Sequence, residues 1–311
     1  MINELKEKTY GKYNALTVAE AFGVNDDLLP KFYGDNGCFS TLFDFSARNL
    51  FEFSPGYYAF PKADIRHYRD CNFATQQKVG ESGFICPILE NHDEPRSVSF
   101  YLKEHQQNAA GAKALGTAFM FLRGLPFIYQ GQELGMTNTH FDDLNEFEDL
   151  LSQDEYKKCR QHGLNHEESM KVLNLQARDH ARTPMLWDES QNAGFTTGTP
   201  WMKVHQDYRS LNVKKQQGDE NSVLNYYRKL TRLRKDPKYL KTFTYGKFES
   251  CGYEKEDVIA YRRVDDTNCL GISMRLETDP ISLCQSELQK RWPMVWATSQ
   301  AVCCTLRLRH S

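Results

Sequence analysis

The sequence lacks any long apolar run. No stretch approaches the roughly 20 apolar residues that a membrane-spanning helix needs. The first residues, Met1-Ile-Asn-Glu-Leu-Lys-Glu-Lys8, lack the apolar centre of a secretory signal. The formal net charge is only −2, so nothing favours nucleic acid or an acidic membrane surface as a partner. We therefore expect a cytoplasmic protein without a membrane or nucleic-acid partner, and the oligomeric state stays open.

The sequence also lacks the usual signatures of metals and cofactors. The nine cysteines are odd in number, scattered from Cys38 to Cys304, and form no Cys-x-x-Cys pair, so neither a disulfide framework nor a zinc site is predicted. No glycine-rich phosphate loop is present. His162 and His166 could share a helix face but have no third ligand, and the acidic run at 142–149 lacks calcium-loop spacing and is typical of a solvated face. We expect no cofactor and no metal.

What the sequence does contain is an alternation of short apolar runs and helical segments. Residues 15–18, 84–89 and 124–129 have the composition of buried strands, and residues 107–123 have the small side chains of a closely packed helix. The first two runs are followed directly by polar residues. Parallel strands that deliver polar groups at their carboxyl ends are typical of an α/β barrel, whose chemistry lies on the loops after the strands.

The strand count and the later segments predict the domain organisation. A complete barrel has eight strand–helix units in about 250 residues, but only three or four units precede residue 150, so the sequence is either a smaller open sheet or begins in mid-barrel. A helix with Ser222 as its cap is expected over 221–235, ended by Asp236-Pro237. We expect three regions, listed here in order: a partial barrel over 1–236, the start of a small β domain over 237–275, and an atypical, possibly frame-shifted tail over 276–311.

Two polar groups at the strand ends are candidates for chemistry. Glu20 follows the first apolar run, and His92-Asp93 follows the second. A carboxyl group at a barrel mouth is partly desolvated, which raises its pKa and keeps a proton for donation. A histidine beside an aspartate supplies a donor and a negative charge, which suits a sugar ring that develops oxocarbenium character. By spacing alone, a glutamate at a strand end is more often a solvated rim residue.

Four ordered segments resemble the α-amylase superfamily. Glu90-Asn-His-Asp-Glu-Pro-Arg96 resembles its fourth signature region, after strand seven, and Leu16-Thr-Val-Ala-Glu20-Ala resembles its third, after strand five. The segment from Gly124 to Asn138 resembles the eighth strand. Ala181-Arg-Thr-Pro-Met-Leu-Trp-Asp and the residues up to Trp201 are similar to the oligo-1,6-glucosidase and dextran-glucosidase (glucan 1,6-α-glucosidase) branch. Together the segments cover about residues 1–265.

The resemblance implies a fold and a set of roles. It implies the C-terminal half of a (β/α)8 TIM barrel, about strands five to eight, followed by part of a small β domain. It identifies Glu20 with the general acid/base, Asp93 with the carboxylate that stabilises the transition state, and His92 with a partner of the reacting sugar. Either Arg178 or Arg182 corresponds to an arginine of the sugar pocket. The implied activity is retaining hydrolysis of α-1,6 or α-1,4 glucosidic bonds in oligosaccharides, without a cofactor.

The sequence departs from the family pattern in one decisive respect. The nucleophile of the family is an aspartate within Gly-x-Arg-x-Asp after strand four, and no such motif occurs here. We therefore expect a C-terminal fragment that is inactive alone. A sucrose isomerase or trehalose-6-phosphate hydrolase of the same branch is an open alternative. A non-catalytic relative, such as the heavy chain of an amino-acid transporter, is disfavoured because Glu20, His92 and Asp93 are all retained and no anchor is visible.

Overall fold

The computed structural model describes residues 2–24, 28–34, 36–48, 54–60, 63–251, 258–275, 294–299 and 302–310. The helices, α-helical and 3-10, are α1 Ile2–Lys8, η1 Tyr10–Tyr13, α2 Leu29–Phe32, η3 Tyr57–Ala59, α3 Ile65–Val79, α4 Ser97–Tyr101, η4 Glu104–Gln106, α5 Ala109–Met120, η5 Gln132–Leu134, η6 Leu144–Glu146, α6 Leu150–Gln161, α7 His166–Gln176, α8 Asp179–Arg182, η7 Gln191–Gly194, α9 Val213–Gly218, α10 Val223–Arg234 and α11 Leu240–Tyr245. The strands are β1 Val18–Ala19, β2 Thr41–Leu42, β3 Lys247–Ser250, β4 Val258–Val264, β5 Asn268–Arg275, β6 Met294–Ser299 and β7 Val302–His310. None of the helices in these ranges is long and apolar enough to cross a membrane.

Four parallel segments lie side by side in the N-terminal part. β1 pairs in parallel with β2, and the next neighbour is the segment 84–89, whose Cys86 N–H donates to Leu42 O at 2.8 Å. Beyond it lies the segment 124–128, where the N–H groups of Leu125 and Phe127 donate to Ile85 O and Pro87 O at 3.0 and 3.1 Å. The donors and acceptors advance together, so this segment is also parallel. The three apolar runs of the sequence therefore belong to one parallel group, in which β2 lies between the first two.

The outer strands of this group are less buried than the sequence indicates. The strand expected at 15–18 is observed only at its end, as β1, and Leu16 is 70% exposed. Leu125 and Ile128 are also exposed at the opposite edge. Within the described ranges no strand pairs with the outer side of β1 or of the segment 124–128. The prediction of burial on both faces is therefore wrong for 15–18, because burial requires a neighbouring strand that the described residues do not supply there.

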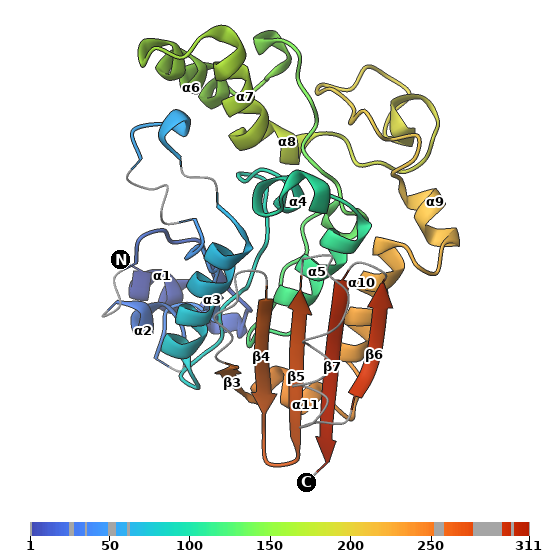
Figure 1. The fold of residues 1–311 in the computed structure, drawn as a ribbon. Helices are drawn as coiled ribbons and strands as arrows, with labels where there is room; N and C mark the ends of the chain where they lie inside the picture. Colours follow the sequence, from blue (N-terminus) through green and yellow to red (C-terminus); the bar gives the residue numbers. More distant parts are fainter. Residues whose placement is uncertain are drawn as a thin grey trace.

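Two helices predicted from the sequence are confirmed, and for α10 the predicted cap, Ser222, is confirmed as well. α5 begins after Asn108, whose side chain accepts from the N–H groups of Ala110 and Gly111. α10 begins after Ser222, whose hydroxyl accepts from Asn225 N–H at 3.1 Å. Both caps satisfy backbone donors that have no partner inside the helix. The two helices pack against one another, and α5 also packs against β5 and β7 of the C-terminal sheet (Figure 1).

The C-terminal part is a five-stranded antiparallel sheet in the order β3-β4-β5-β7-β6. Its inner face joins the main hydrophobic core, in which Tyr261 and Leu270 of the sheet lie with Phe119 of α5 and Tyr227 of α10. Arg263 is fully buried and donates to the carbonyls of Phe121, Phe243 and Gly246. The backbone of 294–299 and 302–310 completes the sheet (Figure 1), although the sequence pattern did not predict these strands. The rest of 276–311 lies outside the described residues, and its origin stays a prediction.

Candidate active site

The candidate site is built on the turn that follows the segment 84–89. Asn91 Oδ1 accepts from Asp93 N–H at 2.8 Å, which closes a tight polar turn at the end of the strand. His92 Nε2 lies 3.2 Å from Asp93 Oδ2, and the side chain of Asp93 is 34% exposed. The turn therefore presents an imidazole and a carboxylate together at the carboxyl end of a parallel strand, as expected from the sequence.

Both candidate arginines reach this turn. Arg178 Nη1 lies 3.1 Å and Arg182 Nη2 lies 2.6 Å from the same oxygen, Asp93 Oδ1. Arg182 Nε also donates to His92 O at 2.8 Å. Arg178 is the N-cap of α8 and Arg182 is its last residue, four positions later, which places them on one face of this single turn. The sequence left open which arginine belongs to the site, and the structure brings both to Asp93.

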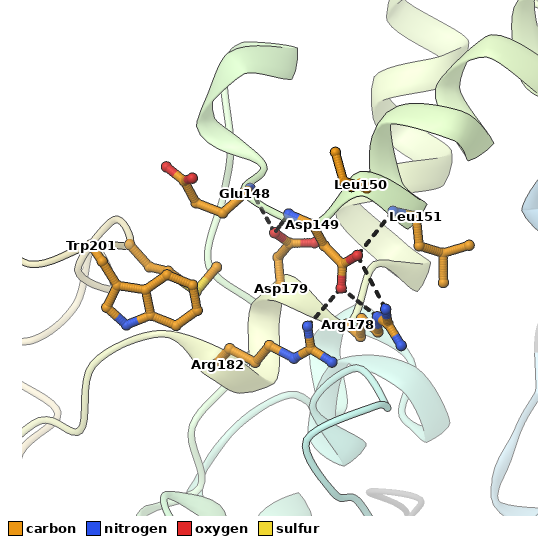
Figure 2. A pocket seen from close by; sticks show the side chains of 9 residues that line it. Glu148, Asp149, Leu150, Leu151, Arg178, Asp179, Arg182 and Trp201 are labelled. Atoms are coloured by element: carbon orange, nitrogen blue, oxygen red, sulfur yellow. Dashed lines mark hydrogen bonds and ion pairs between the residues drawn. The ribbon is translucent and has the colours of Figure 1, made fainter.

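A second carboxylate, Asp149, lies on the far side of the two arginines. Its Oδ2 is in contact with Arg178 Nε and lies 2.6 Å from Arg182 Nη1, while its Oδ1 lies 3.1 Å from Arg178 Nη2. Figure 2 shows both guanidinium groups turned toward this carboxylate. The Asp149 side chain is only 8% exposed, so the interpretation of 142–149 as a solvated acidic face is wrong at this position. Its partners are 29 and 33 residues away, and no local pattern reveals them.

The charges around Asp149 favour its ionised form. Partial burial acts to raise the pKa of Asp149, but hydrogen bonds from Arg178 and from Leu151 N–H outweigh burial and lower the pKa below its usual value. The hydrogen bond to Asp149 raises the pKa of Arg178 in turn. Two carboxylates and two guanidinium groups therefore form an alternating array of opposite charges, with Asp93 at its exposed end.

A buried ion pair lies beneath the turn. The side chains of Glu90 and Arg96 are 0% and 1% exposed, and Arg96 Nη1 lies 3.0 Å from Glu90 Oε1. Arg96 also donates to Gln130 O at 2.7 Å and to Ala181 O at 3.3 Å, and Glu90 Oε2 accepts from Ser97 N–H at 2.6 Å. The pair brackets His92-Asp93 in the sequence and ties the turn to the segments that carry Gln130 and Arg182. The Glu90–Arg96 ion pair therefore stabilises the conformation of the site and has no direct part in its chemistry.

A cavity of about 370 Å³ adjoins the two arginines. Its lining residues come from the start of α6, from α8 and from the long loop that follows: Glu148, Asp149, Leu150, Leu151, Arg178, Asp179, Arg182, Trp201 and Met202. Trp201 is 62% exposed and faces the same space as Arg182 in Figure 2. An exposed indole beside charged donors and acceptors is the type of surface that packs against a sugar ring while polar groups bind its hydroxyls.

Glu20 directly follows β1 and is exposed. Because the carboxyl ends of parallel strands lie at the same end of a sheet, Glu20 is at the same end as Asp93, two segments away. Within the described ranges no hydrogen bond or ion pair joins Glu20 to Asp93 or to the arginines. The partial desolvation expected of Glu20 is therefore not found, because the segments described leave its strand uncovered on one side.

His162 and His166 are the two histidines that the sequence offered as possible metal ligands on one helix face. His162 caps the end of α6 and stacks on Tyr58, whereas His166 begins α7 and its Nδ1 lies 2.8 Å from Tyr156 Oη. The two histidines therefore do not share one helix face. The described part of the chain contains no group of three or more His, Cys, Asp or Glu residues suited to a metal ion.

Comparisons with known proteins agree on one family. Residues 1–243 match the family model of the alpha amylase catalytic domain. The chain is 33% identical over 281 residues to a probable oligo-1,6-glucosidase 3 from Bacillus subtilis, covering 90% of this chain and 50% of that protein. It is 32% identical over 265 residues to a trehalose-6-phosphate hydrolase from the same organism, covering 84% of this chain and 46% of that protein.

The structural comparison extends the match over the whole chain. The crystal structure of isomaltulose synthase from Klebsiella sp. LX3 superposes with a TM-score of 0.85 at 29% sequence identity. The superposition covers 99% of this chain and 58% of that chain. The chain thus spans about half the length of the curated relatives that it matches.

Proposed function

The chain belongs to the α-amylase catalytic-domain family, and from this premise we propose that it supplies the acid/base side of a retaining α-glucosidase site. Its four parallel segments are part of the family's TIM barrel, as expected from the sequence. The observation that carries the proposal is the His92-Asp93 turn, whose carboxylate is bound by Arg178 and Arg182 at a strand end. Glu20 ends another strand of the same group.

Each residue has a distinct proposed role. Glu20 donates a proton to the leaving glycosidic oxygen and later accepts one from water, which is the general acid/base role. Asp93 stabilises the positive charge that develops on the sugar ring, with His92 as a hydrogen-bond donor to a ring hydroxyl. Arg178 and Arg182 hold the Asp93 carboxylate in place. Exposure of Glu20 and partial exposure of Asp93 allow both to contact a substrate.

Asp93 is a poor candidate for the nucleophile. Its Oδ1 already accepts from two guanidinium groups, which draw charge from the carboxylate and lower its nucleophilicity. Retaining hydrolysis nevertheless needs a second carboxylate about 5–5.5 Å from the acid. Because these 311 residues contain no Gly-x-Arg-x-Asp motif, we propose that they do not turn over glucosides by themselves.

The proposed substrates are short α-glucosides with α-1,6 or α-1,4 linkages. The named relatives include oligo-1,6-glucosidases and a glucan 1,6-alpha-glucosidase. A trehalose-6-phosphate hydrolase and an isomaltulose synthase are also similar to the chain, so hydrolysis of trehalose-6-phosphate and isomerisation of sucrose are the competing activities. The cavity beside Trp201 and Arg182 is the proposed position of the sugar that departs.

Two further assignments belong to this proposal. We place the end of the partial barrel near residue 236, because α10 ends at Arg234 and the antiparallel sheet begins soon after, with β3. We also propose a cytoplasmic location. In its support, the six cysteines that the described segments contain outside the C-terminal strands β6 and β7 are free thiols, a state typical of a reducing compartment.

The proposal is tested with a chimera. The N-terminal part of the Bacillus subtilis relative, up to the point where its match to this chain begins, is joined to residue 1, and glucose release from isomaltose is followed by proton NMR. The chimera is expected to release α-glucose first, and Asp93→Asn is expected to lower kcat/KM by roughly 10²–10³-fold. The exposed Asp154→Asn is the matched control. A folded chimera that hydrolyses no α-glucoside, or that is indifferent to Asp93→Asn, contradicts the proposal. The 311-residue chain alone is expected to release no glucose.

A further inference from the structure

The two arginines that bind Asp93 share one more partner, Asp149. Arg178 uses Nε and Nη2 for the Asp149 carboxylate, so that only Nη1 is directed to Asp93. Arg182 uses Nη1 for Asp149 and Nη2 for Asp93, at 2.6 Å each. Asp149 thus determines which edge of each guanidinium group faces Asp93, because a planar guanidinium fork can satisfy two carboxylates in only a few orientations.

Asp149 is also held in place by hydrogen bonds that do not involve the arginines. Asp179, which is fully buried, accepts from the N–H groups of Glu148 and Asp149 at 2.9 and 3.0 Å and from Ser152 Oγ at 2.5 Å. Asp149 Oδ1 also accepts from Leu151 N–H at 2.9 Å, as the N-cap of α6. These bonds fix both the backbone and the side chain of Asp149 before any contact with the arginines is considered.

We propose that Asp149 is a positioning residue for the Asp93 carboxylate. It acts through Arg178 and Arg182, which it orients so that both donate to Asp93 Oδ1 while Oδ2 is left to His92. The orientation of both arginines by Asp149 follows from these contacts alone. Its consequence for catalysis rests on the proposed function, since an Asp93 that loses this support binds the sugar less well only if Asp93 binds a sugar at all.

The cap role of Asp149 offers a way to separate positioning from simple structural support. Asparagine is as good an N-cap as aspartate, so Asp149→Asn keeps the bond to Leu151 N–H and removes the charge that binds the arginines. Asp149→Ser also keeps a cap residue but has a side chain too short to reach both guanidinium groups. Asp154→Asn changes an exposed carboxylate of the same helix, paired with Lys157 at 2.9 Å, and is the matched control.

The test observes the arginine Nε–H groups of the 311-residue chain by nitrogen-15 NMR, without sugar and without turnover. In Asp149→Asn and Asp149→Ser, solvent exchange of Arg178 Nε–H is expected to become faster by roughly tenfold or more, because its charged acceptor is lost. The Arg182 signal is expected to shift, while the backbone amide signals of α6 stay in place. Asp154→Asn is expected to change none of these signals.

Two results overturn the proposal. In the first, both arginine signals and their exchange rates are unchanged in Asp149→Asn. In the second, the α6 amide signals collapse in both Asp149 variants, which assigns the residue to capping alone. Neither result depends on hydrolysis, so a failed isomaltose assay with the chimera refutes the proposed function while leaving the positioning role of Asp149 intact.

Discussion

Asp44 is a buried carboxyl group whose removal is expected to stabilise the protein at neutral pH. It follows β2 and is 6% exposed. Its Oδ1 accepts from Ser46 N–H at 3.0 Å and from Thr75 Oγ1 at 3.4 Å, while its Oδ2 is buried and has no hydrogen-bond partner among the described residues. Burial raises its pKa from 3.8 to about 6, and the bonds from Ser46 and Thr75 offset this only in part.

The sign and size of the effect follow from this pKa. The folded chain keeps the proton of Asp44 up to a higher pH than the unfolded chain does. The free energy of unfolding therefore falls as pH rises from 3.8 to about 6, and it stays lower above that pH. The shift of roughly two pH units corresponds to about 3 kcal/mol. Asp44→Asn removes the charge and keeps an oxygen acceptor. It is therefore expected to stabilise the chain by about 1–3 kcal/mol at pH 7.5 and by very little near pH 4.

The assay is urea unfolding followed by tryptophan fluorescence at several pH values between 4 and 8. The free energy of unfolding of wild type is expected to decline over this range relative to Asp44→Asn, and the difference is expected to level off above about pH 6. Asp154→Asn, at an exposed position, serves as the control. An Asp44→Asn variant that is less stable than wild type at pH 7.5, or a difference that does not vary with pH, refutes the reasoning.

Two further substitutions test the packing beneath the site, each by urea unfolding. Arg96→Met leaves the buried carboxylate of Glu90 without its cation and is expected to cost about 3–5 kcal/mol, and a cost under 1 kcal/mol contradicts the account. Gly124 has φ +134°, and a Cβ there meets the carbonyl oxygen of Ile85, so Gly124→Ala is expected to cost about 1–3 kcal/mol. Gly218→Ala, which meets nothing within 4 Å, is its control, and equal costs for the two refute the steric argument.

Local patterns in the sequence predicted those parts of the fold that local interactions determine. Both α5 and α10 were predicted, and for α10 the cap Ser222 was predicted too, because the side chain of a cap residue bonds to backbone two or three positions away. The position of His92-Asp93 directly after the strand at 84–89 was also predicted, whereas the bond from Asp93 N–H to Asn91 Oδ1 that closes the turn was not. The roles of Glu20, His92, Asp93 and the arginines came from the resemblance and stay predictions.

Contacts between distant segments could not be predicted. Asp149 lies in an acidic run that is typical of a solvated face, and only the fold brings α8 against it. Glu94 is similar: it follows Asp93, and it pairs with Arg48 from the loop after β2. Burial raises the pKa of Glu94 to about 7 against the opposing effect of Arg48. No spacing rule connects residues 46 positions apart, so these pairs become visible only in three dimensions.

The central claim is that Glu20 is the general acid of a retaining α-glucosidase site, and it is tested most directly by Glu20→Gln in the chimera with two substrates. Isomaltose needs a proton on its leaving oxygen, whereas the fluoride of α-glucosyl fluoride leaves without one. The account predicts that kcat/KM for isomaltose falls by roughly 10²–10⁴-fold and that kcat/KM for α-glucosyl fluoride stays close to that of the unsubstituted chimera. Equal losses for both substrates, or no loss for isomaltose, contradict it.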